Sequence, residues 1–280
     1  RSKQKGEPMS YLARETASLP AKLWSRIDSA VSDAARQTLI SRRFLHLFGP
    51  LGAGTDSVAI DNADALAEVA TDGLITTAGR KIVEIPTIYD DFTLFAKDLA
   101  ASEHAGVAVD VSRAAAAAER CARKEDKLVL LGDASCGYEG LLTAGGINKI
   151  KRSDWNTGEN AFLDVTCGLA LFAKEELYGP YALLLSPDLF ASLHRIQPGT
   201  GILEIDRLRT LVNGHIYQTP LLGNEIKAAL LDTSERNMDL AVGLDLSVAY
   251  LEQSNLNHVF RVLETAIARL KRPGAVIVFE

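Results

Sequence analysis

The chain has 280 residues, of which 47% are hydrophobic and 24% are charged, a composition that can bury a substantial core and excludes a largely disordered chain. Its net charge of −6 argues against nucleic acid as the main partner, because binding the phosphate backbone needs a basic face. No apolar run reaches the length of about 18 residues that a transmembrane helix needs, and the polar start lacks the apolar segment of a signal peptide.

The first predicted element is an amphipathic helix that begins near Pro20. Residues 1–8, which are polar, are interpreted either as a tag remnant or as the stub of an upstream segment. From Leu23 to Leu39 an apolar residue recurs every four positions, which gives a helix one apolar stripe. Pro20 suits the first turn, and two arginines suit the negative end of the helix. Residues 44–48 alternate and predict a strand that stops at a glycine-rich stretch.

A long strand excursion and a second helix are predicted next. Residues 55–96 are strand-like with polar interruptions, and they predict a two-stranded excursion without a helix. Ser112 is expected to cap a second helix that runs to about Leu131. The alanine run at 114–118 favours this helix and gives it a thin surface against which other elements can pack closely.

The charged end of this second helix holds two adjacent acids, Glu125 and Asp126. Neighbouring positions on a helix point about 100° apart, so these carboxylates are not expected to work as a general acid and base. We interpret them instead as a salt-bridged or exposed helix end on the solvent side of the helix.

Residues 133–240 are rich in glycine and predict short helices and short strands. Within them lies GPYALLLSPDLF, residues 179–190, which predicts a buried strand followed by a helix. Ser186 is placed to cap that helix, with Pro187 at its first position. No GxSxG motif surrounds Ser186, so a cap is favoured over a nucleophile.

Three strands are expected to close the chain, over residues 240–250, 258–270 and 275–279. The first two alternate well, and the third follows a Pro-Gly turn. Strands that pair over long sequence distances, mixed with separate helices, predict the α+β class.

Groups that could carry chemistry are sparse. The glycines at 49, 52 and 54 have GxxGxG order without a following Lys-Ser/Thr, so a phosphate loop is not predicted. The five histidines show no HxH or HxxxH spacing, so the sequence gives only weak support for a metal site. The three cysteines are odd in number and lack CxxC spacing, as is typical of free thiols in a reducing compartment. We therefore predict no catalytic residue, bound cofactor or metal.

Taken together, four stretches of the chain resemble the family 1 encapsulins, bacterial nanocompartment shell proteins related to the major capsid proteins of tailed phages. The stretches are residues 23–28 with 41–52, residues 122–132 with 137–142, residues 179–189, and GLDLSVAY at 243–250. Each motif is weak alone, but their order and spacing agree over nearly the whole chain from Met9 onward. The resemblance implies a Hong Kong 97-type capsid fold.

The resemblance also implies a division of the chain. It comprises an amino-terminal helix with the first peripheral strand (9–48), an extended loop (49–96), a peripheral domain with a spine helix (97–132), an axial domain (133–240), and closing strands of the peripheral domain (241–280).

By the same resemblance, the expected function is structural rather than enzymatic. Identical subunits would close into an icosahedral shell, a cytoplasmic encapsulin nanocompartment. The shell would enclose a cargo enzyme, such as a ferritin-like protein for iron storage or a peroxidase, by binding its targeting peptide on the inner face. The residues implied for that peptide are Leu39, Arg42, His46, Asp245, Leu246, Ser247 and Val248. Alternatively, these positions only pack the helix on the sheet.

Several positions depart from the family pattern. Some members bind flavin through a Trp before the spine helix, but Lys97 stands at the matching position, so flavin is not expected. His46 stands where relatives often have an acid, which leaves the charge preference of the peptide pocket open. Two other functions stay as alternatives: a phage or prophage major capsid protein, and a hydrolase, for which no nucleophile–base spacing is present.

Overall fold

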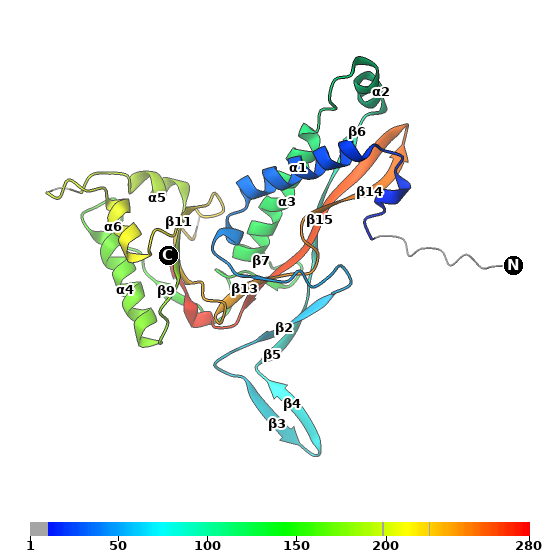
Figure 1. Ribbon diagram of the computed structural model, residues 1–280. Helices are drawn as coiled ribbons and strands as arrows, with labels where there is room; N and C mark the ends of the chain where they lie inside the picture. The colour runs from blue at the N-terminus through cyan, green and yellow to red at the C-terminus, as the bar shows by residue number, and fades with distance from the viewer. Residues whose placement is uncertain (1–10, 198, 224) are drawn as a thin grey trace.

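The computed structural model describes residues 11–197, 199–223 and 225–280, and the interpretation of residues 1–8 lies outside these ranges. Figure 1 shows a sheet covered by long helices, a hairpin loop that projects from it, and a second sheet with its own helices. Both sheets combine segments from distant parts of the chain. The α+β prediction is confirmed.

The first sheet is built around its longest strand, β15 (Asn257–Leu270). Among the described residues, five strands form this sheet. The others are β1 (Leu47–Phe48), β6 (Thr87–Leu94), β13 (Met238–Val242) and β14 (Ser247–Ser254). The first half of β15 pairs with both β14 and β6, and its second half pairs with β13. The strand β15, near the end of the chain, thus pairs with β6 from the first half of the chain.

Two helices, α1 (Ala21–Thr38) and α3 (Ser112–Leu131), cover this sheet (Figure 1). The predicted apolar stripe of α1 is buried, and α1 lies across α3. Ala114, Ala117 and Ala118 of α3 have no exposed surface, so the predicted thin packing surface is confirmed. Ser112 is not a cap: it is the first helical residue, and its hydroxyl donates to the Asp110 carboxylate. Pro20 likewise precedes α1 instead of lying in its first turn.

The predicted two-stranded excursion is present and projects from the first sheet (Figure 1). It consists of β2 (Ser57–Asp61) paired with β5 (Arg80–Glu84), and β3 (Ala67–Thr71) paired with β4 (Leu74–Ala78). We call the part formed by β3 and β4 the hairpin tip. Every residue of β3 and β4 is exposed. The strand β6 lies within the predicted loop range of 49–96, yet it pairs with β15.

A further helix, α2 (Ala96–Ala105), lies between β6 and α3 and was not predicted. Within the described residues it buries no side chain, and its sequence carries almost no apolar stripe. Because apolar periodicity is missing here, the hydrophobic pattern does not predict this helix.

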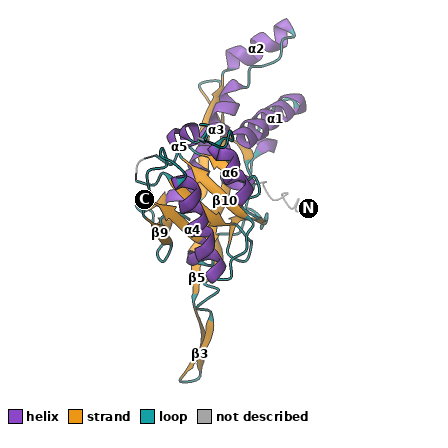
Figure 2. Ribbon diagram, turned by 90° about the vertical axis from the view of Figure 1, so that its left-hand side faces the viewer, coloured by secondary structure: helices purple, strands orange, loops and turns teal. Residues whose placement is uncertain are grey.

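The second sheet runs in the order β11-β10-β12-β16-β9. These strands are β9 (Asn148–Ile150), β10 (Tyr181–Leu185), β11 (Ile216–Gln218), β12 (Ala228–Asp232) and β16 (Val276–Phe279). Two helices, α4 (Asn160–Lys174) and α6 (Glu204–Leu211), lie side by side over it (Figure 2). A two-residue pair, β7 (Gly132–Asp133) and β8 (Tyr138–Glu139), links the end of α3 to this part.

GPYALLLSPDLF forms β10 and the short helix α5 (Pro187–Ser192), as predicted. Ser186 occupies the N-cap position, but its hydroxyl donates to the Asp188 carboxylate instead of capping the backbone. This hydrogen bond, with Lys227 beside it, lowers the pKa of Asp188 to about 2. The segment is a buried strand with a polar helix start.

The strand predicted at 240–250 is interrupted. Both β13 and β14 run antiparallel to β15, with Val242 opposite Ala266 and Ser247 opposite Leu263. From Val242 to Ser247 the chain advances by five residues, whereas β15 advances by only three between their partners. The extra residues between β13 and β14 form a bulge. Gly243 begins it, and a side chain there would lie 2.5 Å from the Thr265 hydroxyl.

Candidate functional site

A hollow of about 300 Å³ lies where the end of α1 faces the bulge between β13 and β14. Its lining comes from α1, from the turn after it, and from the bulge. The lining residues are Ser32, Ala35, Arg36, Leu39, Arg42, Arg43, Asp245 and Leu246. Four of the seven residues implied for peptide binding are among them, so segments about 200 residues apart meet here as the resemblance implied.

The other three implied residues lie outside this lining. The Ser247 hydroxyl donates to the Asp245 carbonyl at 2.7 Å and holds the bulge. Val248 is buried in β14. His46 is exposed and lies 3.4 Å from the Glu235 carboxylate, away from the hollow. The structure thus brings together Leu39, Arg42 and the start of the fourth motif, but not His46.

The turn that positions Arg42 is fixed by a buried acid. After α1 the chain forms a 3₁₀ turn, η2 (Ser41–Arg43), and the strand predicted at 44–48 forms only at Leu47–Phe48. Asp126 of α3 accepts the backbone N–H groups of Ile40 and Ser41, each at 2.9 Å. Burial raises the pKa of Asp126, whereas these hydrogen bonds favour its charged form. The expectation that Asp126 faces solvent is therefore wrong.

Arg42 is held by three carboxylates. Its guanidinium donates to Glu125 of α3 at 2.7 Å, to Glu264 of β15 at 2.6 Å and to Asp245 of the bulge at 2.6 Å. Glu125 and Glu264 have no exposed surface. Of the two interpretations of Glu125, the salt-bridged one is confirmed and the exposed one is wrong. Arg42 ties α1, α3, β15 and the bulge into one unit.

The charges in this cluster are unbalanced, because one guanidinium faces two buried carboxylates and a third at the rim. Burial, and next the Glu125 carboxylate, raise the pKa of Glu264 well above its usual range, although Arg42 works in the opposite direction. Burial would lower the pKa of Arg42, but the bonded carboxylates raise it. Partial burial opposes ionisation of Asp245, and Arg42 nevertheless lowers the pKa of Asp245.

The hollow therefore combines an apolar floor with charged walls. Ala35 and Leu39 are buried at its base, and Leu246 is half-buried beside them. Arg36 and Arg43 are exposed at the rim. Such a site fits an apolar side chain of an extended peptide, with charge on either side. Ser32, Ala35 and Arg36 precede Leu39 by seven, four and three residues, a spacing that places them on the same face of a helix. This spacing is the signal in the sequence that could have identified them as lining residues.

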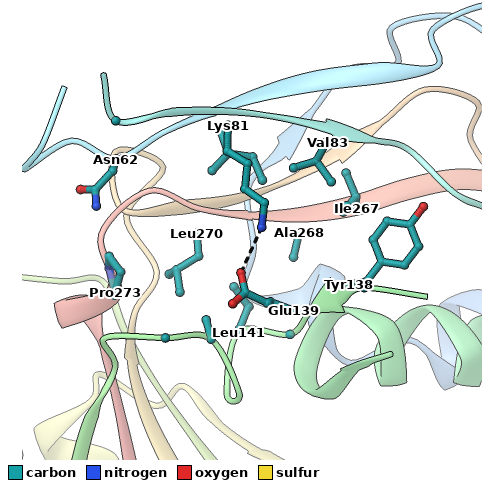
Figure 3. A pocket seen from close by; sticks show the side chains of 16 residues that line it. Asn62, Lys81, Val83, Tyr138, Glu139, Leu141, Ile267, Ala268, Leu270 and Pro273 are labelled. Atoms are coloured by element: carbon teal, nitrogen blue, oxygen red, sulfur yellow. Dashed lines mark hydrogen bonds and ion pairs between the residues drawn. The ribbon is translucent and has the colours of Figure 1, made fainter. Parts of the chain in front are cut away.

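A second, smaller hollow of about 180 Å³ lies at the root of the projecting loop (Figure 3). Figure 3 shows the Lys81 ammonium group reaching across it to Glu139, at 3.3 Å. Close by, Val58 and Ile85 of the loop pack on Ala241 and Ile267 of the first sheet. These contacts fasten the loop to the body.

The described ranges contain no group of three His, Cys, Asp or Glu side chains placed to hold a metal ion. Nor does any helix in them have the length and apolar character to cross a bilayer.

Comparison with solved structures defines the fold. A virus-like particle from Pyrococcus furiosus superposes with a TM-score of 0.74 and 23% identity, covering 93% of this chain and 100% of that chain. The capsid of Myoviridae phage XM1 superposes with a TM-score of 0.62 and 17% identity, covering 85% and 90%. The fold is thus that of capsid-type shell subunits, and the predicted Hong Kong 97-type capsid fold is confirmed.

Sequence comparisons define the family. The family model described as "Encapsulating protein for peroxidase" matches residues 9–267. The "Type 1 encapsulin shell protein EncA" of Myxococcus xanthus is 38% identical over 277 residues, or 96% of each chain. The "Diheme-cytochrome-encapsulin shell fusion protein" of Kuenenia stuttgartiensis is 38% identical, covering 92% of this chain and 72% of that protein. The chain belongs to the encapsulin family of shell proteins.

Proposed function

We propose that identical copies of this chain close into an icosahedral shell in the cytoplasm and that the shell holds a cargo enzyme. The chain itself supplies the wall, and no catalytic residue or cofactor is assigned to it. Family membership supports the shell role, because relatives that are 38% identical are named shell proteins. Closed symmetry would give each copy the same set of contacts.

The observation that carries the proposal is the hairpin tip. In the single chain Leu74 and Ile75 are 72% and 68% exposed, on a hairpin that projects from the body (Figure 1). A two-stranded hairpin is marginally stable alone, and apolar strand edges invite pairing with another chain. Contact with neighbouring copies would cover these side chains, in an interface of about 1,200–2,000 Å² or more.

We further propose that the hollow beside Arg42 receives the targeting peptide of the cargo. Its support is the convergence of Leu39, Arg42, Asp245 and Leu246 on one hollow with an apolar floor. A ferritin-like cargo, and with it iron storage, is supported by a "Ferritin-like-encapsulin shell fusion protein" of Pyrococcus furiosus that is 29% identical over 171 residues. A peroxidase cargo is supported by the family description.

Electron microscopy of the purified protein, with mass analysis of the contents, tests the shell. We expect closed particles that are hollow or hold an enzyme. A soluble monomer or dimer would exclude the shell, and particles filled with DNA would favour the phage capsid alternative.

A matched pair of variants tests the hollow. Ser32→Trp places a large ring among the lining residues, whereas Asp33→Trp makes the same addition at an exposed neighbouring position of α1. Adjacent helical positions point about 100° apart, so only the first ring fills the hollow. We expect both variants to form shells and only Ser32→Trp to lose cargo on co-purification. Equal cargo in both variants would remove the hollow as the peptide site.

A further inference from the structure

A groove of about 610 Å³ lies at the end of the first sheet opposite the projecting loop. Its lining comes mainly from residues 18–26, at the start of α1, and from residues 99–109, in and after α2. We call it the distal groove. The loop precedes the first residue of β6 and α2 follows its last, so the length of β6 separates the two (Figure 1). The subunit thus has a projection at one end and a groove at the other.

The floor of the distal groove is apolar. Leu23 of α1 is buried, and Leu99 and Val109 are half-buried against the same core cluster. Val107, which also lines the groove, is 65% exposed. Since α2 buries no side chain among the described residues, one wall of the groove is a helix that packs little against its own chain. The groove therefore offers apolar surface to a partner.

Two cations line the groove without forming a salt bridge to any described residue. Lys22 and Arg26 lie four residues apart on α1 and share one face, where like charges repel. The positive end of a helix also disfavours cations, and α1 has no acid in its first turn. Glu103, the single acid in the described lining, pairs with neither cation. These two charges disfavour the helix in the single chain, and an acidic partner would neutralise them.

The hairpin tip has the opposite charge. Residues 62–79 contain three acids and no lysine, arginine or histidine. Asp64 lies 3.2 Å from Arg272, next to the body of the subunit. Glu68 and Asp72 lie on the tip itself and form no salt bridge with a described residue. The tip therefore carries acids that a cationic surface would complement.

One face of the tip combines an acid with an apolar side chain. In the β3–β4 pair, Glu68 lies opposite Thr77 and Ala70 lies opposite Ile75. Cross-strand partners share a face of a hairpin, and so do alternate residues of one strand. Glu68 and Ile75 therefore lie on the same face, which matches the apolar floor and cationic wall of the groove.

We propose that the hairpin tip of one copy docks in the distal groove of the next copy, with Ile75 on the apolar floor and Glu68 beside Lys22 and Arg26. The inference rests on the proposed shell, in which neighbouring copies cover the tip, and it names the surface that receives it. A contact between opposite ends of identical chains is head-to-tail, and such contacts generate rings where the rotation closes. The charges favour this arrangement over contact between two acidic tips.

Reversed charges test the groove. Lys22→Glu with Arg26→Glu makes the groove acidic, and Glu68→Lys with Asp72→Lys makes the tip basic. We expect either pair alone to lower the yield of shells about tenfold, measured by size-exclusion chromatography with light scattering, and all four changes together to restore it. Lys97→Glu reverses an exposed cation of α2 outside the groove lining and should form shells as the wild type does.

The outcomes separate the groove from the shell. Acids suit the start of a helix, so the change at Lys22 and Arg26 favours α1 and lost shells would not reflect misfolding. Shells at wild-type yield from either reversed pair, or no recovery in the combined variant, would overturn the groove and leave the shell in place. A wild type that forms no shells would instead contradict the proposed function.

Cross-linking tests the same contact without relying on shell yield. Ile75→Cys and Val107→Cys are placed in a chain whose exposed Cys136 and Cys167 are replaced by serine. Under mild oxidation, the chain with both new cysteines should form a ladder of disulfide-linked oligomers on a non-reducing gel, because each copy joins the next. Chains with one new cysteine should remain monomers. Absence of the ladder would overturn the proposal, and so would dimers from Ile75→Cys alone, which would place tip against tip.

Discussion

Arg42 shows how one side chain can couple the fold to the candidate site. A buried carboxylate is costly unless it is paired, and Glu125 and Glu264 share a single guanidinium in the interior. The third carboxylate, on Asp245, is at the rim of the hollow. Any shift of Arg42 toward a bound peptide would leave two buried acids without their cation. We therefore regard Arg42 as a fixed support of the hollow rather than as a free cation.

Glu264 gives this cluster a dependence on pH. Its pKa in the folded chain lies well above the ordinary value of 4.5, so ionising it in place costs free energy that the unfolded chain does not spend. Its contribution to stability is complete at acid pH and declines as the pH rises from about 4.5 toward the folded pKa. Glu264→Gln removes this decline while keeping an acceptor for Arg42.

We expect the melting temperatures of Glu264→Gln and the wild type to be similar near pH 4 and to differ increasingly as the pH rises, with the variant the more stable. Differential scanning calorimetry across this range measures the gap. Glu252→Gln, at an exposed position of β14, is the control and should follow the wild type at every pH. A constant gap for Glu264→Gln would show that Glu264 keeps an ordinary pKa.

Elements that repeat an apolar pattern could be predicted from the sequence. Each carries its signal locally: a period of about four residues in α1, a run of alanines in α3, a continuous apolar run in β10, and alternation in β15. Local patterns of this kind predict the elements but not the strands with which they pair. Of these four elements, α1 contributes residues to the lining of the hollow.

Elements fixed by distant polar contacts could not be predicted in the same way. The turn η2 exists because Asp126, about 85 residues away, accepts its N–H groups, and adjacent acids on a helix are ordinarily exposed. The bulge before β14 depends on Gly243 fitting against Thr265. Both features position the hollow, so its location followed from the resemblance, whereas the Arg42 cluster within it did not.

At the scale of the whole molecule, the hairpin tip is a part of the single chain that packs against no core. The two sheets and their helices bury continuous apolar clusters, but the hairpin tip presents Leu74 and Ile75 to solvent on a projecting arm (Figure 1). The projecting loop is attached to the body at its root, where Val58 and Ile85 pack, and this contact does not involve the tip. A substitution at the tip can therefore change contacts between copies without altering the fold of one copy.

Ile75→Asp is expected to prevent or weaken shell closure. A charge at this position would be harmless in the single chain, where Ile75 is exposed, but would be desolvated wherever a neighbouring copy covers the tip. Thr76→Asp, at the next exposed position of β4, is the matched control because it replaces a polar side chain. Size-exclusion chromatography with light scattering should show small oligomers for Ile75→Asp and shells for Thr76→Asp, and circular dichroism should show the same secondary structure in both. Shells of normal size and stability from Ile75→Asp would mean that the apolar side chains of the tip do not hold neighbouring copies together, and the closing contacts would then have to lie on the body of the subunit.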